Sequence, residues 1–287
     1  MTQDLYTQIQ QFYDASSQLW EQIWGEHMHH GYYGSKGTLK IDRRQAQINL
    51  IEELLLWANV NNNDDRKPQN IIDVGCGIGG STVYLAQKFG AKAKGISLSP
   101  VQVSRATERA TEAGLKSTVN FQVADALKMP FADNTFDLVW SLESAEHFPD
   151  KKNFLEEAYR ILQPGGKLIM ATWCHRPVNS SSDELTEKEK RLLEEIYRVY
   201  CLPFVISLPE YEKLTVDCGF KNLQSDDWSI AVAPFWDVVI DSAITPQAIF
   251  GLIQAGGKTI RAAISLMLMR QGYKRGLIRF GLITATK

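Results

Sequence analysis

Three glycines that alternate with other residues follow an apolar run interrupted by one acid, in the stretch IIDVGCGIGG at residues 71–80. A helix-like segment, STVYLA, comes directly after them. A strand that turns through glycines into a helix brings backbone N–H groups and a helix N-terminus close to a ligand. The stretch therefore predicts a nucleoside-binding loop. Its spacing fits both the GxGxG of S-adenosylmethionine (SAM) sites and the GxGxxG of dinucleotide sites.

Alternating strand-like and helix-like segments surround this loop and must position it. We expect strands at 70–74, 93–97, 118–123, 136–141, 167–173, 221–228 and 276–284, and intervening helices at 79–89, 100–113, 151–162, 186–200 and 208–218. Strands that alternate with helices form parallel sheets. The fold class predicted is α/β, with a seven-stranded, mostly parallel, Rossmann-like sheet flanked by helices.

Helical segments outside this alternation extend the chain at both ends. Residues 4–24 carry a helical apolar stripe, Asp42 is placed to cap a helix over 42–57, and 231–272 is an apolar, helix-patterned insertion. We divide the chain into an N-terminal helical cap (1–60), a cofactor-binding core (61–178), a core continuation with inserted helices (179–230), a helical lid (231–273) and a last strand (274–287).

The composition excludes several classes of function. The chain has 287 residues and a formal net charge of −2, so no basic field indicates nucleic acid binding. Its four cysteines show no CxxC pairing, which is typical of free thiols in a reducing compartment. Neither a targeting segment nor an apolar run of about 18 residues is visible, so we expect a cytoplasmic protein. The sequence leaves the oligomeric state open.

A loop dense in histidine and aromatic residues, WGEHMHHGYYG, lies at residues 24–34. The spacing of His27, His29 and His30 fits no standard zinc pattern, and no cysteine is near. We expect no metal, and a loop that lays polar and aromatic groups over a pocket.

Residues at the ends of the expected strands decide between the two cofactors. A dinucleotide fold expects an acid about twenty residues past the glycines, but the second strand ends in ISLS at 96–99. Asp125, at the end of the third strand, can accept a hydrogen bond from an adenine amino group. Ser141 and Glu143 end the fourth strand, at the edge where ligands bind in such sheets. With the QPGG turn at 163–166, these features favour SAM over NAD.

Several longer motifs carry a resemblance to a known family. They are WGEHMHHGYY (24–33), DRRQAQ (42–47), the glycine loop, LSPVQ (98–102), WSLES (140–144), TWCHRP (172–177) and APFW (233–236). With them the chain resembles, over nearly its full length, the tocopherol C-methyltransferases of photosynthetic organisms, within the class I SAM-dependent methyltransferases. The His-rich loop and TWCHRP are its narrowest signals. Plant members carry a transit peptide, so the resemblance implies a cyanobacterium-like member.

The resemblance implies SAM as the cofactor and suggests where it binds. In the wider group of SAM enzymes, the positions of Ser97, Leu98 and Gln102 contact the nucleoside, and the loop near Tyr32 and Tyr33 closes over the methionine end. The full set of cofactor-binding residues that we expect is Asp73, Gly75, Gly77, Gly79, Ser97, Leu98, Gln102, Asp125, Ala126, Ser141 and Tyr33.

The resemblance also implies a chromanol acceptor, methylated on a ring carbon ortho to a phenol, as in the conversion of γ- to α-tocopherol. A phenol has a pKa of about 10, so ionising it at pH 7 costs roughly 4 kcal/mol, and a nearby base lowers that barrier. Glu146 and His147 are the best candidates, with Glu143 next, and the ordinary pKa of imidazole favours His147. Alternatively, Glu143 binds the SAM amino group and His147 orients a loop.

The acceptor site that we expect is apolar and aromatic, for a small lipophilic molecule. Ala145 and Phe148 stand where the family usually has Gly and Met, which narrows the space. Tyr32, Tyr33 and Trp173 are placed for cation–π contact with the sulfonium, or for plain packing. The insertion adds an apolar wall at Phe235, Trp236, Phe250 and Ile253.

Basic residues flank this apolar region, and they suit either peripheral contact with a membrane or a solvated helix face. They are Lys258, Arg261, Arg270, Lys274 and Arg275.

Three other functions remain open from the residues alone. The runner-up is a SAM-dependent N-methyltransferase acting on an indole-type natural product, because such enzymes share this ancestry. An NAD-dependent oxidoreductase lacks its ribose acid here, and a non-catalytic SAM-binding protein would not need the polar cluster at 143–147.

Overall fold

The computed structural model describes residues 2–61, 67–178, 183–243 and 257–287. Its centre is a seven-stranded sheet in the order β3-β2-β1-β4-β5-β7-β6. The strands are β1 (Asn70–Val74), β2 (Lys92–Ser97), β3 (Val119–Val123), β4 (Phe136–Leu142), β5 (Leu162–His175), β6 (Lys221–Asp227) and β7 (Ile278–Thr286). The first five are parallel, and β7 runs antiparallel to β5 and β6. The predicted fold class is confirmed.

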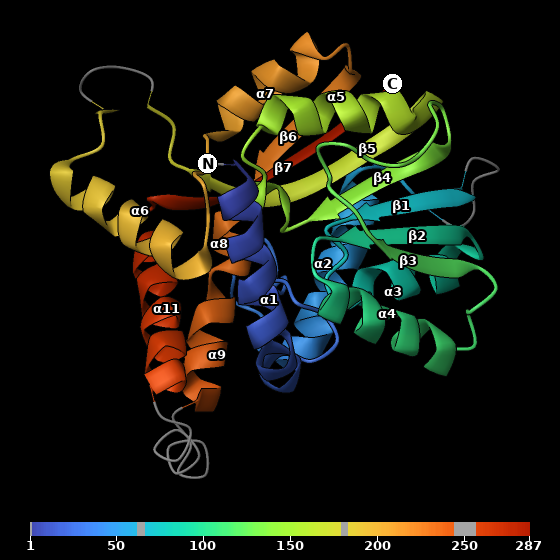
Figure 1. Cartoon of the computed structure of the whole chain (residues 1–287). Helices are drawn as coiled ribbons and strands as arrows, with labels where there is room; N and C mark the ends of the chain where they lie inside the picture. The colour runs from blue at the N-terminus through green and yellow to red at the C-terminus, as the bar shows by residue number, and fades with distance from the viewer. Residues whose placement is uncertain (1, 62–66, 179–182, 244–256) are drawn as a thin grey trace.

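Helices cover both faces of this sheet (Figure 1). They are α1 (Thr2–Trp24), α2 (Arg43–Trp57), α3 (Gly80–Phe89), α4 (Pro100–Glu112), α5 (Lys151–Ile161), α6 (Glu187–Tyr200), α7 (Leu208–Asp217), α8 (Ser229–Val232), α9 (Pro234–Ala243) and α11 (Gly257–Lys274), with a 3-10 turn, η1 (Ala145–His147). Asp42 caps α2 as predicted, because its carboxylate accepts a hydrogen bond from the Gln45 N–H.

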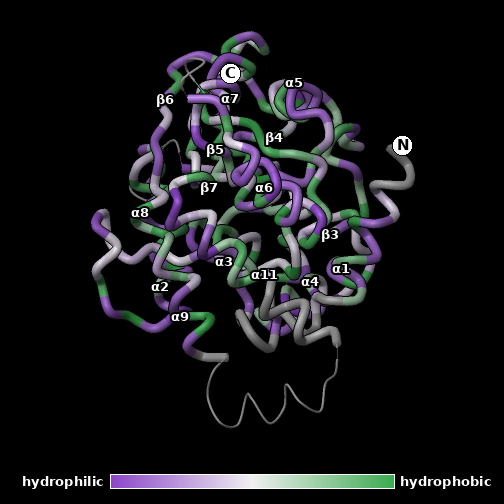
Figure 2. The backbone as a smooth tube through the Cα atoms, turned by 90° about the vertical axis from the view of Figure 1, so that its left-hand side faces the viewer, coloured by the Kyte–Doolittle hydropathy of each residue, from purple (hydrophilic) through white to green (hydrophobic). Residues whose placement is uncertain are grey.

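Two apolar cores lie on opposite faces of the sheet, since successive strand residues point to opposite sides. Leu138 packs into the core that α2, α3, α6 and α11 cover, and the next residue, Val139, packs into the core under α5 and α7. Figure 2 shows the contrast between hydrophobic colour along β4 and hydrophilic colour along the surface helix α6.

The helix α1 lies at the front of the molecule in the view of Figure 1 and packs against α4. The Glu21 carboxylate of α1 pairs with the guanidinium groups of Arg105 and Arg109 on α4, at 2.9 and 2.7 Å. The described part of the predicted insertion at 231–272 forms the end of α8, the helix α9 and most of α11. Phe250 and Ile253, and the side chains of Lys258 and Arg261, lie outside the described residues.

The expected turn at 163–166 is an irregular segment within β5: Leu162 pairs with Phe136 and Lys167 with Leu138, so four residues of β5 lie opposite one residue of β4. Gly165 has a φ of 79°, its N–H donates to the carbonyl of Lys287 at 3.0 Å, and the Lys287 N–H donates to the Gly166 carbonyl at 2.9 Å. The end of the chain therefore pairs with this segment. No helix among the described residues is long and apolar enough to cross a membrane.

Candidate active site

The turn from β1 into α3 holds its glycines in the left-handed region, with φ at 81° for Gly75, 52° for Gly77 and 83° for Gly79. A Cβ on Gly75 would lie 2.2 Å from the Cβ of Ser144, so only glycine fits there. Gly75 and Gly77 line a cavity at the carboxyl edge of the sheet. A Cβ on Gly79 would instead meet the side chain of Ala106 on α4, so this glycine serves helix packing.

Asp73, in β1, supplies a buried carboxyl group at the wall of the same cavity. The Thr82 hydroxyl donates to its Oδ2 at 2.6 Å. Burial raises the pKa of Asp73 to about 7, against the opposing effect of the Thr82 hydrogen bonds. A cationic ligand beside it would favour the ionised form.

The ends of β2 and β3 form the wall next to the glycines. The Ser97 hydroxyl donates to Oε1 of Gln102 at 2.7 Å, and Asp125 Oδ1 accepts from the Leu127 N–H at 2.9 Å. Burial and then Asp125 raise the pKa of Tyr6 on α1 to about 12. The cavity wall here includes Ser97, Leu98, Gln102, Asp125 and Ala126, all predicted for the cofactor.

Glu143 follows β4 with a left-handed backbone, φ 52°. Its carboxylate accepts hydrogen bonds from the His30 N–H at 2.6 Å, from His30 Nδ1 at 2.7 Å and from Trp173 Nε1 at 3.0 Å. Burial alone would raise the pKa of Glu143, but the charge and hydrogen bonds of His30 outweigh it and the pKa is lowered. Such a backbone persists where its surroundings hold it in place.

The His-rich loop is fixed by the helix that follows it. The side-chain amide of Gln47 on α2 donates to the carbonyls of His27 at 2.5 Å and His29 at 3.0 Å. A Cβ on Gly31 would lie 2.5 Å from the Cβ of Ala46. The DRRQAQ and His-rich motifs therefore support each other. Within the part of the chain that the structure describes, no group of three or more His, Cys, Asp or Glu side chains is arranged to hold a metal ion.

Glu146 lies in the turn η1 and is almost fully buried, at 1% exposure. The Thr172 hydroxyl donates to its Oε2 at 2.8 Å. Burial and then the charge of Glu143 raise the pKa of Glu146 to about 8. Lys151, also buried, donates from Nζ to the carbonyls of Ala145 at 2.8 Å and Glu146 at 2.9 Å, which fixes the turn.

His147, in the same turn, meets α1. Burial and then the charge of Lys151 lower the pKa of His147 to about 3, so the imidazole is neutral near pH 7. The hydroxyl of Tyr13 lies 2.6 Å from its Nε2. A neutral imidazole with so low a pKa is a weak base and a suitable hydrogen-bond acceptor.

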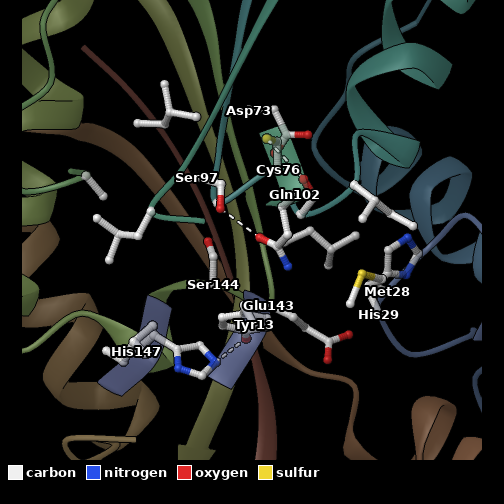
Figure 3. Close-up of a pocket in the computed structure, with 18 of the residues that line it drawn as sticks. Tyr13, Met28, His29, Asp73, Cys76, Ser97, Gln102, Glu143, Ser144 and His147 are labelled. Atoms are coloured by element: carbon white, nitrogen blue, oxygen red, sulfur yellow. Dashed lines mark hydrogen bonds between the residues drawn. The ribbon is translucent and has the colours of Figure 1, made fainter. Parts of the chain in front are cut away.

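These groups surround one cavity of about 1280 Å³, mouth included. In Figure 3, Asp73, Cys76, Ser97 and Gln102 lie toward one end, and Tyr13, Glu143 and His147 toward the other. Residues of α1, which the sequence predicted only as a helix with an apolar stripe, also line it: Tyr6, Ile9, Phe12 and Tyr13. Their helical spacing signals a common face, but not what that face covers. Met28, Cys76 and Tyr200 are further lining residues that the motifs did not single out.

The two tyrosines expected over the methionine end lie outside this cavity. Tyr33 is 1% exposed and packs in the core with α2, and its N–H donates to the Ala231 carbonyl at 2.9 Å. The ring of Tyr32 lies 5.1 Å from that of Trp228. Met28 and His29, earlier in the loop, line the cavity instead, and from Gly31 on the loop packs closely against Ala46 of α2.

Four other expected residues lie behind the cavity wall. Phe235 and Trp236 are fully buried against the His30 ring, each with centroids 4.9 Å apart. The Ser141 hydroxyl bonds to that of Ser144 at 2.8 Å, and the Ala145 side chain is fully buried. Phe148 and Trp173 do line the cavity, as do Glu143, Glu146 and His147.

The chemistry of this wall fits SAM. Glycines without side chains at the end of β1, hydroxyl and amide groups at β2 and a carboxylate at β3 suit a nucleoside, and the carboxyl groups of Asp73 and Glu143 suit a cationic amino-acid end. SAM, when bound, supplies a methyl group already activated on a sulfonium.

Comparison with known proteins agrees with this geometry. Residues 72–170 match the methyltransferase domain family. The chain is 49% identical over 276 residues to “Probable tocopherol O-methyltransferase, chloroplastic” of Oryza sativa subsp. japonica, covering 96% of this chain and 76% of the relative. It is 44% identical to the tocopherol O-methyltransferase of Arabidopsis thaliana, covering 100% and 83%. The norajmaline N-methyltransferase of Rauvolfia serpentina is more distant, at 33% identity and 97% of both chains.

Among solved structures, the geranyl diphosphate C-methyltransferase of Streptomyces coelicolor A3(2) superposes with a TM-score of 0.76 at 20% identity, over 98% of this chain and 97% of that one. This likeness supports the fold. The 44–49% identity to the two tocopherol methyltransferases, over nearly the whole chain, shows the family: the protein is a SAM-dependent methyltransferase and belongs to the tocopherol methyltransferase family of the class I fold.

Proposed function

We propose that the acceptor is the chromanol ring of γ- or δ-tocopherol, methylated on a ring carbon ortho to the phenol hydroxyl. The names of the rice and Arabidopsis relatives described above support this acceptor. The observation that carries the chemistry is Glu146, a buried carboxyl group at the cavity wall whose pKa is raised to about 8. That value lies about two units below that of a free phenol, which makes proton transfer only mildly uphill.

Glu146 is therefore the base in our proposal, in preference to His147. The carboxylate takes the phenol proton, and the negative charge spreads to the ortho carbon, which forms the new bond to the methyl group. SAM, when bound, would supply the methyl group and keep the electron pair of the broken C–S bond on sulfur. The ring carbon then gives up its own hydrogen as a proton to solvent, and Glu146 returns its proton to the phenol oxygen. Thr172 and Lys151 hold Glu146 in place through its side chain and its carbonyl.

The other residues bind and enclose the reactants. Asp73, Gly75, Gly77, Ser97, Leu98, Gln102, Asp125 and Ala126 form the cofactor wall. Phe148 and Trp173, with Ile9 and Phe12 of α1, give the acceptor end its apolar surface. Because α1 covers the cavity, it excludes water from the reaction.

The test is transfer of a deuterated methyl group from SAM to γ-tocopherol, δ-tocopherol and norajmaline, with the products identified by NMR. We expect a new aromatic C-methyl group on both tocopherols. A methyl ether on the phenol oxygen would overturn the carbon assignment, since oxygen shares the phenolate charge. Transfer only to the alkaloid nitrogen would favour the N-methyltransferase alternative, which the 33% identity to the norajmaline enzyme keeps open.

We also propose that the enzyme works at a membrane surface, because an acceptor with a long apolar tail partitions into lipid. Met267 on α11 is 62% exposed, and Lys274 and Arg275 at the end of that helix are exposed cations. The protein should sediment with vesicles that contain anionic lipid more than with neutral ones. Equal recovery in the supernatant for both would contradict this.

A further inference from the structure

The carboxylate of Glu143 lines the cavity, yet it already accepts three hydrogen bonds from groups of the protein. Oε1 accepts from the His30 backbone N–H, and Oε2 accepts from both His30 Nδ1 and Trp173 Nε1. Two of these three donors belong to one residue, so His30 fixes the position of both oxygens. The side chain of Glu143 still keeps 6% exposure and lines the cavity.

The other edge of the His30 ring lies in an aromatic box. Ring centroids lie at 4.9 Å for Phe235 and Trp236, 5.4 Å for Phe280 and 5.6 Å for Tyr273. Its Nε2 is buried and has no hydrogen-bond partner among the described residues. These four rings pack around the imidazole and hold its orientation, so that Nδ1 stays directed at the Glu143 carboxylate.

The order of strands shows which part of SAM lies nearest to Glu143. Along the sheet, the end of β3 with Asp125 is followed by β2 with Ser97, by β1 with the glycines, and then by β4 with Glu143. A nucleoside over β3 and β2 therefore directs the amino-acid end of SAM across β1 toward β4. That end carries an ammonium group, which a fixed carboxylate complements.

We propose that His30 is a positioning residue: it holds the Glu143 carboxylate in the orientation that receives the ammonium group of SAM. His30 itself lies behind Glu143 and does not reach the ligand. This inference rests on the use of SAM by the family and is independent of the acceptor proposed above. It also gives the His-rich loop a function other than metal binding.

The test compares ligands that differ only in the amino-acid end, with calorimetry as the readout. S-adenosylhomocysteine keeps the ammonium group, whereas 5′-methylthioadenosine lacks the whole end. In His30→Phe, S-adenosylhomocysteine should bind about tenfold more weakly, the usual worth of a hydrogen bond to a charged group, with 5′-methylthioadenosine unchanged. His30→Asn, which keeps an N–H near the position of Nδ1, should stay within about threefold of the parent.

Each control has an outcome that would overturn the proposal. An equal loss for both ligands in His30→Phe would reveal a purely structural role. Decarboxylated SAM, which keeps the ammonium but not the carboxylate, should also bind more weakly to His30→Phe; an unchanged affinity would overturn the ammonium assignment. In a Glu143→Gln background, His30→Phe should cause no further loss, and additive losses would argue against coupling.

If His30→Phe does not fold, Trp173→Phe provides the same test. It removes one of the three donors to Glu143 and keeps an aromatic ring in place. We expect it to weaken S-adenosylhomocysteine by about threefold relative to 5′-methylthioadenosine. An unchanged ratio of the two affinities would contradict the role assigned to this hydrogen-bonded group.

Discussion

The hydroxyl of Tyr13 donates to Nε2 of His147 across 2.6 Å and 134 positions of the sequence. Burial and then Glu146 raise the pKa of Tyr13 strongly, so the phenol keeps its proton. The lowered pKa of His147 leaves its imidazole free to accept that proton in a hydrogen bond. The bond thus ties the cover helix α1 to the turn η1 that carries Glu146.

Tyr13→Phe should weaken the closure of α1 over the acceptor. We expect the KM for the acceptor to rise about tenfold, as for the loss of one buried hydrogen bond, because Phe fills the same space without a hydroxyl. Steady-state kinetics at saturating SAM measure this. His147→Gln, whose amide oxygen can accept from Tyr13, is the matched control, and a larger KM in this variant than in Tyr13→Phe would contradict the role of the bond.

Turnover should depend on the ionisation of Glu146. Because its pKa is raised to about 8, the carboxylate form accumulates only as the pH rises through that value, so kcat should increase from pH 7 to pH 9. Glu146→Gln should lower kcat by a factor of about 100 or more and remove this rise, since the amide cannot take a proton. A Gln variant with the parental pH profile would exclude Glu146 as the base.

The pH dependence of stability should report the buried neutral His147. Its pKa in the folded state, about 3, lies below the unfolded value of 6.5, so its contribution to stability is full above pH 6.5 and is lost as the pH falls toward 3. Between pH 7 and pH 5 this lowers the free energy of unfolding by about 2 kcal/mol. In urea unfolding, the free energy of unfolding of His147→Gln should fall between pH 7 and pH 5 by about 2 kcal/mol less than that of the parent. An equal fall in both proteins would refute a buried, neutral His147.

Replacement of the first loop glycine should be far more costly than replacement of a glycine at a helix end. Gly75 and Gly90 both have positive φ, at 81° and 64°, but a Cβ at Gly75 would collide with Ser144 whereas nothing lies within 4 Å at Gly90. Gly90→Ala should cost about 1 kcal/mol and Gly75→Ala about 3 kcal/mol or more. Denaturant titration measures both, and equal costs would show that the loop relaxes without strain.

Removal of the carboxylate at the end of β3 should weaken nucleoside binding. Asp125 lines the cavity, accepts a hydrogen bond from the Leu127 N–H and is also hydrogen-bonded to the side chain of Tyr6. A carboxylate has further lone pairs that can accept from an adenine amino group. Asp125→Ala should lower the affinity for SAM about tenfold. If calorimetry gives Asp125→Ala the same affinity for SAM as the parent, Asp125 does not bind the adenine.

The sequence by itself determined the sheet and most of the residues that line one wall of the cavity. A glycine turn, strand ends and helix caps are local features, because their backbone conformations and periodicities depend on neighbouring residues. For this reason residues such as Gly75, Ser97 and Asp125 could be placed at one edge before any contact was known.

Only the tertiary structure decided what closes the site and how its carboxyl groups behave. The stripe on α1 predicted burial but not the surface it covers. The His-rich loop packs against α2 at Gly31, and Tyr33 lies in the core rather than over the ligand. Glu143 and Glu146 are near neighbours in sequence, yet His30 lowers the pKa of one, and burial with the charge of Glu143 raises that of the other. Such differences arise from partners distant in sequence, and only the folded chain brings those partners together.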